Sequence, residues 1–255
     1  MNGTATRDGS GFQRALDAVL LLAVILAAWQ GLYASVGEVA ITSPLGTLAE
    51  IEQLLGSPVF WGTVGATATA LAVSAAISAL AGGAAGLALG CHRFAGVVAE
   101  PILAALYTLP KVTLYPVVLL VFGLGVSAKI AFGVMHGVIP VVLFTMSAVR
   151  NIEPVHLKTA RMLKLTAFQT ASTILAPAVV PEIFTGLRVG FALTLLGVLI
   201  GEMFASQRGL GFMIMNGMNT HDVPTMTAVV VLLIIFAVIV SSLLLTLDRK
   251  LHRRG

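Results

Sequence analysis

Long apolar stretches set the main constraint on what this chain can fold into. Hydrophobic residues make up 58% of its 255 residues and charged residues only 10%, whereas about 25% of a typical soluble domain is charged. A helix needs about 20 apolar residues to cross a bilayer. Segments of that length predict six membrane spans, at 14–34, 60–90, 96–122, 129–148, 172–203 and 223–247. We therefore expect an all-α polytopic membrane protein with six transmembrane helices and one transmembrane domain over 1–255.

The first apolar run has a second interpretation. Arg7 and Arg14 precede it, as positive charges precede a secretory signal peptide. The run is long and lacks a small-x-small cleavage site, which favours a membrane span.

Most of the cations lie in the two terminal segments and in the connections after the second and fourth spans. With six spans, these segments all lie on the same side of the membrane. These cations are Arg7, Arg14, Arg93, Arg150, Lys158, Arg161, Lys164, Arg249, Lys250, Arg253 and Arg254. The opposite connections hold Lys129 and Arg208, with the acids Glu38, Glu50, Glu52 and Asp222. The positive-inside rule predicts that both termini face the cytoplasm. Orientation also explains the net charge of +4 better than nucleic-acid binding does.

Small residues and prolines mark the packing of the spans. Gly82, Gly86 and Gly90 recur every four residues, a spacing that lets two helix backbones approach closely. This stripe can serve packing within the chain or a seam between two copies. Pro110 and Pro116 interrupt the third span, and a kinked helix either shapes the bundle or lines a pathway.

Several kinds of chemistry are excluded by the motifs. No Gly-x-x-x-x-Gly-Lys-Ser/Thr element is present to cradle a nucleotide phosphate, and no His-Glu-x-x-His or Gly-x-Ser-x-Gly pattern is present. The single cysteine, Cys91, excludes an intramolecular disulfide and a zinc cluster. We expect no catalytic residue, no metal site and no cofactor bound by this chain.

Ionisable residues within the spans are few: Glu100, Lys111, Glu182, Arg188 and Glu202. A charge at the hydrocarbon centre costs at least about 2.5 kcal/mol, so each should face a cavity or a partner. Lys111 and Arg188 are candidates to attract an anion. Alternatively, Glu182 pairs with a nearby cation and Arg188 snorkels towards the cytoplasm. His136 lies inside the fourth span, where a lone histidine is typical of packing.

A basic, semi-polar island at 150–169 lies between the fourth and fifth spans, and Pro177 and Pro181 follow it. Here the chain resembles the membrane subunits of bacterial ABC importers. It looks most like the permease family for sulfonates, taurine, nitrate and thiamine-precursor pyrimidines. That family's cytoplasmic loop carries Glu-Ala-Ala, then Gly, then an apolar-x-Leu-Pro. The aligned positions here are Lys158, Thr159, Ala160, Lys164, Ile174, Leu175, Ala176 and Pro177, of which Ala160, Ile174 and Pro177 agree.

Other segments resemble the same family in order and spacing. They are Leu109-Pro110-Lys111, Tyr115-Pro116, Val121-Phe122-Gly123-Leu124-Gly125, Lys129-Ile130, Gly186-Leu187-Arg188, Glu202-Met203 and Gly209-Leu210-Gly211-Phe212. The resemblance covers nearly the whole chain and implies a permease bundle of the type I importer kind.

The resemblance also implies roles for residues. A short amphipathic helix in the loop 150–170 would dock in a groove of an ATP-binding subunit. Helical spacing puts Ala160, Leu163 and Ala167 on one face and Arg161, Lys164 and Phe168 on another, and Lys164 in place of Gly should permit the helix to continue. The coupling residues expected are Lys158, Thr159, Ala160, Arg161, Met162, Lys164, Leu165, Phe168 and Gln169. The residues expected along the translocation path are Lys111, Tyr115, His136, Arg188 and Glu202.

We therefore expect the transmembrane subunit of an ATP-driven importer in the bacterial inner membrane. Its expected partners are a second permease copy, two ATP-binding cassette subunits that carry ATP and Mg, and a periplasmic solute-binding protein. The solute is expected to be small and anionic or zwitterionic, such as a sulfonate, taurine or nitrate. Alternatives are an ion-coupled secondary transporter, a non-transporting scaffold subunit, and an ABC permease for a thiamine-precursor-like heterocycle.

Overall fold

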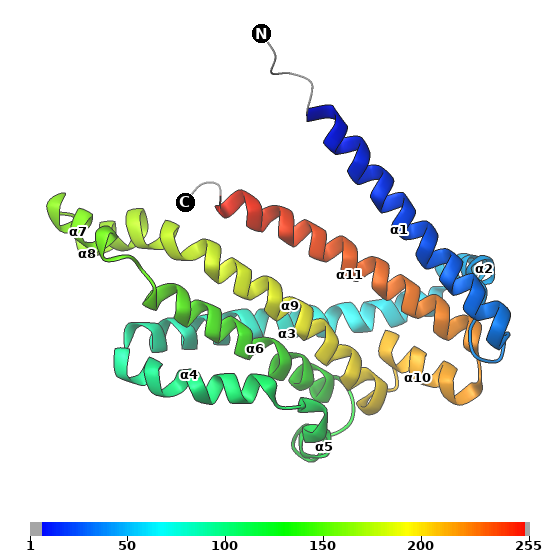
Figure 1. Cartoon of the computed structure of the whole chain (residues 1–255). Helices are drawn as coiled ribbons and strands as arrows, with labels where there is room; N and C mark the ends of the chain where they lie inside the picture. Colours follow the sequence, from blue (N-terminus) through cyan, green and yellow to red (C-terminus); the bar gives the residue numbers. More distant parts are fainter. Residues whose placement is uncertain (1–6, 253–255) are drawn as a thin grey trace, which may run out of the picture. The chain divides into compact units, whose positions relative to one another are not determined.

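The fold is described from a computed structural model, over residues 7–252. Within that part of the chain every regular element is a helix (Figure 1). The elements are α1 (Arg7–Val36), α2 (Pro44–Leu55), α3 (Pro58–Cys91), α4 (Arg93–Thr108), η1 (Lys111–Leu114), α5 (Tyr115–Phe122), α6 (Val126–Arg150), α7 (Pro154–Met162), α8 (Ala167–Gln169), η2 (Thr170–Leu175), α9 (Ala176–Ala205), α10 (Leu210–Thr220) and α11 (Val223–His252). The all-α polytopic prediction is confirmed.

Five of the described helices are long and apolar enough to cross a membrane: Leu16–Val36, Pro58–Cys91, Val126–Arg150, Ser172–Phe204 and Val223–Lys250. The pair Arg93–Thr108 and Lys111–Phe122 passes the same test together, which brings the total to six if that pair is one span. The pair is bent by 85° at the break. The segment 96–122 is therefore two helices and not one continuous span.

Pro110 explains where this break falls. Its ring removes a backbone N–H donor and disfavours the helical conformation of the residue before it. Leu109 accordingly has an extended backbone (φ −61°, ψ 135°), and Lys111 then begins the short helix η1.

The chain forms two compact units. The first comprises the chain up to Ser57 together with Asn216–Leu232. In it, the Ser43 hydroxyl caps α2 by accepting a hydrogen bond from the Gly46 N–H (3.1 Å), and the Thr225 hydroxyl donates to Glu50 Oε1 (3.1 Å). The second comprises Pro58–Met215 and the chain from Leu233, and it holds every site described below.

In the second unit, α6 is the central helix and packs against α3, α9 and α4. The glycine stripe of α3 faces α6: a Cβ built at Gly82, Gly86 or Gly90 would lie 2.6–2.8 Å from the Cβ of Val141, Thr145 or Val149. Such separations leave no room for a side chain. The stripe thus packs two helices of the same chain, and any larger residue would push α3 and α6 apart.

Candidate functional site

The loop helix α7 ends in a Schellman motif. The Leu165 N–H donates to the Ala160 carbonyl (3.1 Å) and the Lys164 N–H donates to the Arg161 carbonyl (3.1 Å). This arrangement satisfies carbonyls that the end of a helix leaves without partners, and it requires a left-handed residue at its turn. Lys164 is that residue, with φ +50°. It stands at the position where the loop of the resembled family has its glycine.

A second helical segment begins immediately afterwards. The Thr166 N–H donates to Gln169 Oε1 (3.0 Å), and the Gln169 N–H donates to Thr166 Oγ1 (3.3 Å), which together form a capping box. The chain then continues through α8 and the π-helical segment η2 into α9. The prediction of one uninterrupted helix through Lys164 is therefore wrong. Helical propensity alone could not reveal the stop, which lies in the termination and capping hydrogen bonds on either side of Leu165.

The break changes which side chains the loop exposes. Ala160 is buried at the end of α7, whereas Met162, Leu163 and Phe168 are 83%, 63% and 80% exposed. Leu163 thus does not share a buried face with Ala160. The remaining coupling candidates are exposed, except for the half-buried Leu165: Lys158, Thr159, Arg161, Lys164 and Gln169. The loop therefore presents apolar side chains among cations. Figure 1 shows α7 and α8 at the far end of α9 from α10.

Three of the path candidates gather at the broken span. Lys111 is 8% exposed; its Nζ donates to the Tyr107 carbonyl (3.1 Å) and lies 5.5 Å from the centroid of the Tyr107 ring. The Phe132 ring stacks on His136 (centroids 6.2 Å apart) and packs against Tyr115 (5.6 Å). Tyr115, Phe132 and His136 thus pack together, and Lys111 lies four residues before Tyr115 at the break.

Glu202 lies elsewhere, in a buried ion pair. Its carboxylate is 3.1 Å from Lys129 Nζ, and the two side chains are 0% and 2% exposed. The Thr67 hydroxyl donates to the same carboxylate (2.8 Å to Oε2), and the Gly211 N–H donates to Oε2 (3.1 Å). A buried ion pair is tolerated when further hydrogen bonds satisfy the charges, and this one is so satisfied. We name Lys129, Glu202 and Thr67 the buried latch.

The buried latch holds the start of α10. Lys129 Nζ also donates to the Arg208 carbonyl (3.3 Å), and the Leu210 N–H donates to Thr67 Oγ1 (2.8 Å). The carboxylate therefore lies at the N-terminus of α10, where the helix dipole favours negative charge. Three helices, α3, α6 and α9, supply the side chains that fix this turn.

Arg188 has a carboxylate neighbour of its own. Its Nε lies 3.7 Å from Asp248 Oδ2, and Thr185 Oγ1 donates to Asp248 Oδ1 (3.0 Å). The pair joins α9 to the last turns of α11. Arg188 thus has the carboxylate of Asp248 beside it, an acidic neighbour that neither sequence interpretation of Arg188 included.

The search for ionisable residues within the spans did not identify Lys129, Thr67 or Asp248 as partners of Glu202 or Arg188, although Lys129-Ile130 is among the segments that resemble the family. Lys129 is the first residue of the predicted span 129–148 and its charge counts with the connection before that span, and Asp248 lies beside C-terminal cations that indicate orientation. The signal available was chemical: Glu202 and Arg188 in apolar helices each required a partner of opposite charge. Among the described residues, no group of three or more His, Cys, Asp and Glu side chains is placed to hold a metal ion.

The fold and these residues agree with the comparison to known families. Residues 78–254 match the family of binding-protein-dependent transport system inner membrane components. The chain belongs to this family. It is therefore a multi-pass inner-membrane transport permease, and its family is one of transport rather than catalysis.

Individual relatives indicate which kind of transport permease the chain resembles. SsuC of Bacillus subtilis (strain 168), named for aliphatic sulfonates transport, is 26% identical over 98% of this chain and 92% of its own length. The nitrate import permease NrtB of Leptolyngbya laminosa is 29% identical, over 92% and 86%. The taurine transport system permease TauC of Escherichia coli (strain K12) is 26% identical, over 65% and 60%. The chain is an ABC importer permease of this type.

Proposed function

We propose that two copies of this chain enclose the translocation path of an ATP-driven importer for a small anionic or zwitterionic solute. Two ATP-binding cassette subunits, which carry ATP and Mg, would dock on the loop 150–170, and a periplasmic solute-binding protein would deliver the solute. The family description names the binding-protein dependence, and the relatives named for sulfonates, nitrate and taurine support the solute class.

The observation that carries the solute class is which cations of the bundle have an acidic partner. Lys129 faces Glu202, Arg188 faces Asp248, and Arg150 faces Glu100. Lys111 belongs to no ion pair with another described residue, although it is buried in the broken span. A buried charge without an opposite charge is costly. An anionic group of the solute, arriving beside Lys111, would supply the missing charge.

The exposed loop supports the ATP-driven part of the proposal. Phe168, Met162 and Leu163 offer apolar anchors, and Arg161 and Lys164 flank them with positive charge. Aromatic anchors in a desolvated groove dominate many protein interfaces. A nucleotide-driven movement of the partner would shift α7 and α8, and through η2 it would reach α9. By linkage, ATP and solute must favour different populations of the inward- and outward-facing states.

Uptake by variants tests the role of Lys111. Lys111→Met keeps the length of the side chain and removes its charge, so we expect anion uptake in whole cells to fall at least about tenfold, equivalent to ~1.4 kcal/mol. Lys250→Met, which removes an exposed cation at the end of α11, is the matched control and should leave uptake unchanged.

Arg188→Met should act differently. It leaves the Asp248 carboxylate without its guanidinium, so its main effect should be a lower amount of folded permease in the membrane. Normal uptake per folded permease in Lys111→Met would rule out the anion path proposed here, whatever the result for Arg188→Met.

A further inference from the structure

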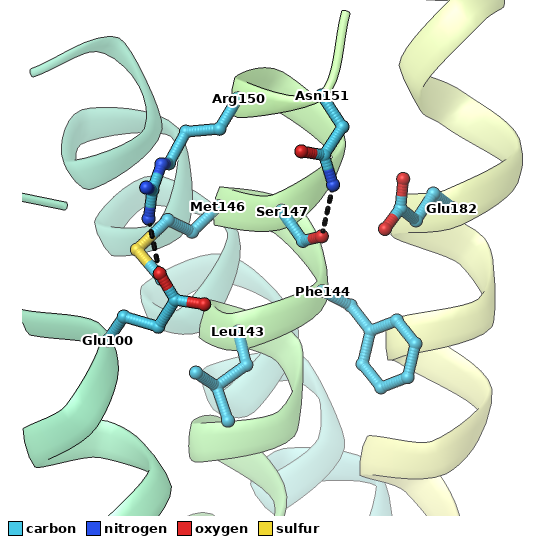
Figure 2. Close-up of a pocket in the computed structure, with 8 residues that line it drawn as sticks. All are labelled: Glu100, Leu143, Phe144, Met146, Ser147, Arg150, Asn151 and Glu182. Carbon is cyan, nitrogen blue, oxygen red and sulfur yellow. Dashed lines mark hydrogen bonds and ion pairs between the residues drawn. The ribbon is translucent and has the colours of Figure 1, made fainter. Parts of the chain in front are cut away.

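A second polar site lies at the loop end of the bundle, apart from Lys111. It is a pocket of about 300 Å³ formed by side chains of α4, α6 and α9 and by Asn151 (Figure 2). The residues that line it are Glu100, Leu143, Phe144, Met146, Ser147, Arg150, Asn151 and Glu182. A concave site with a few convergent polar groups is the usual form of a small-molecule site.

One side of the pocket carries both signs of charge. Arg150 Nη1 lies 2.6 Å from Glu100 Oε2, and the two side chains are 27% and 57% exposed. The Glu100 side chain is thus the more exposed of the two. Arg150 is the more buried of the two, and Glu100 engages only its Nη1, so the other N–H groups of the planar guanidinium can donate to an acidic group.

The other side carries a carboxylate, an amide and a hydroxyl, and Glu182 is its only charged residue among those that line the pocket. Glu182, on an apolar span, is half-buried, and its carboxylate makes no hydrogen bond or ion pair with another described residue. Asn151 Nδ2 donates to Ser147 Oγ (3.0 Å), which leaves the Asn151 amide oxygen to accept. The Phe144 ring lines the same side. Figure 2 shows the Glu182 carboxylate directed from α9 towards Ser147 and Asn151, with Phe144 below it.

We propose that this pocket binds a small zwitterion, with its ammonium group against Glu182 and the Asn151 oxygen and its acidic group against Arg150. The ammonium would neutralise a half-buried carboxylate. It would also make a cation–π contact with the Phe144 ring. This site goes beyond the proposed path: it needs no second copy, no ATP-binding subunit and no contribution from Lys111.

The charges favour a small zwitterion over a cationic side chain of a partner protein. A lysine or arginine inserted into the pocket would be attracted by Glu182 but would also meet the guanidinium of Arg150. A molecule that carries both signs satisfies both sides at once. The volume of about 300 Å³ is also of the size that small-molecule sites have.

Direct binding to the full chain in lipid nanodiscs tests the proposal. The probe is radiolabelled taurine, in which a sulfonate and an ammonium flank two carbons. We expect saturable binding below about 10 mM. Glu182→Gln, which keeps the shape of the side chain, should raise the Kd at least about tenfold, and Phe144→Leu should raise it about fivefold. Glu52→Gln, an exposed carboxylate in the other unit, is the control and should leave the Kd unchanged.

A competitor that lacks the ammonium tests the role of that group. Ethanesulfonate lacks the ammonium, so it should compete at least about tenfold more weakly than unlabelled taurine and should not respond to Glu182→Gln. Equal competition by ethanesulfonate, or an unchanged Kd in Glu182→Gln, would overturn the proposal. Absence of taurine binding, combined with loss of ATP-binding subunit association in Glu182→Gln, would also overturn it and assign the pocket to a cationic side chain. Lys111→Met should leave taurine binding at this pocket intact. The proposal for this pocket and the proposal for the anion path can therefore be contradicted independently of each other.

Discussion

At the residue scale, the buried charges divide into a structural group and a functional group. Lys129 and Glu202 satisfy each other, together with Thr67 and the backbone of the α9–α10 turn. Neither Lys129 nor Glu202 is therefore left with an uncompensated charge that a solute could neutralise. Lys111 and Glu182 differ because neither has an oppositely charged partner among the described residues, and each is partly or fully buried. Burial without an opposite charge is therefore the property that marks a candidate site in this molecule.

The buried latch predicts a specific pattern of stabilities. Lys129→Met should leave the Glu202 carboxylate buried without its cation and destabilise the permease by about 3–5 kcal/mol. The double variant Lys129→Met/Glu202→Gln removes both charges and should recover much of that loss. Thermal unfolding of the purified permease in detergent is the measurement. A double variant as unstable as the sum of the two single variants would show that the ion pair does not couple these residues.

At the element scale, the sequence could predict long helices but not how their ends are made. The apolar runs predicted α3, α6, α9 and α11, because burial in a bilayer demands unbroken apolar length. The stop at Lys164 and the restart at Thr166 depend on a few hydrogen bonds, which hydrophobic periodicity does not report. Thr166-x-x-Gln169 was the readable signal, since a capping box has that spacing. The Glu202 partners could not be predicted because Lys129 lies 73 positions away along the chain.

The left-handed Lys164 leads to a stability prediction. Glycine adopts a positive φ without steric cost, whereas other residues cost about 1–2 kcal/mol there. Lys164→Gly should therefore strengthen the end of α7, and Lys164→Val, with a β-branched side chain, should weaken it. Hydrogen exchange at the Leu165 amide reports the difference. Faster exchange in Lys164→Gly than in the wild type would contradict the Schellman geometry.

The exposed end of the loop leads to a coupling prediction. Phe168 is 80% exposed, and truncating an aromatic interface anchor costs about 2 kcal/mol or more. Phe168→Ala should therefore reduce ATP-binding subunit association or uncouple hydrolysis from transport, without affecting membrane insertion. Lys158→Met is a suitable comparison, because rim charges tune association rates more than affinity. Normal association and normal solute-stimulated transport in reconstituted Phe168→Ala would exclude this loop as the coupling element.

At the scale of the whole molecule, the central claim is that ATP, and not an ion gradient, drives this permease. The complex should be purified from its native membrane through a tag on this chain and reconstituted with its binding protein. Uptake of radiolabelled taurine, ethanesulfonate and nitrate is then followed with ATP or a non-hydrolysable analogue inside the vesicles, with and without a protonophore. We predict uptake of at least one of these solutes that requires hydrolysable ATP and survives the protonophore. Uptake without ATP that the protonophore abolishes would contradict the account and identify an ion-coupled transporter.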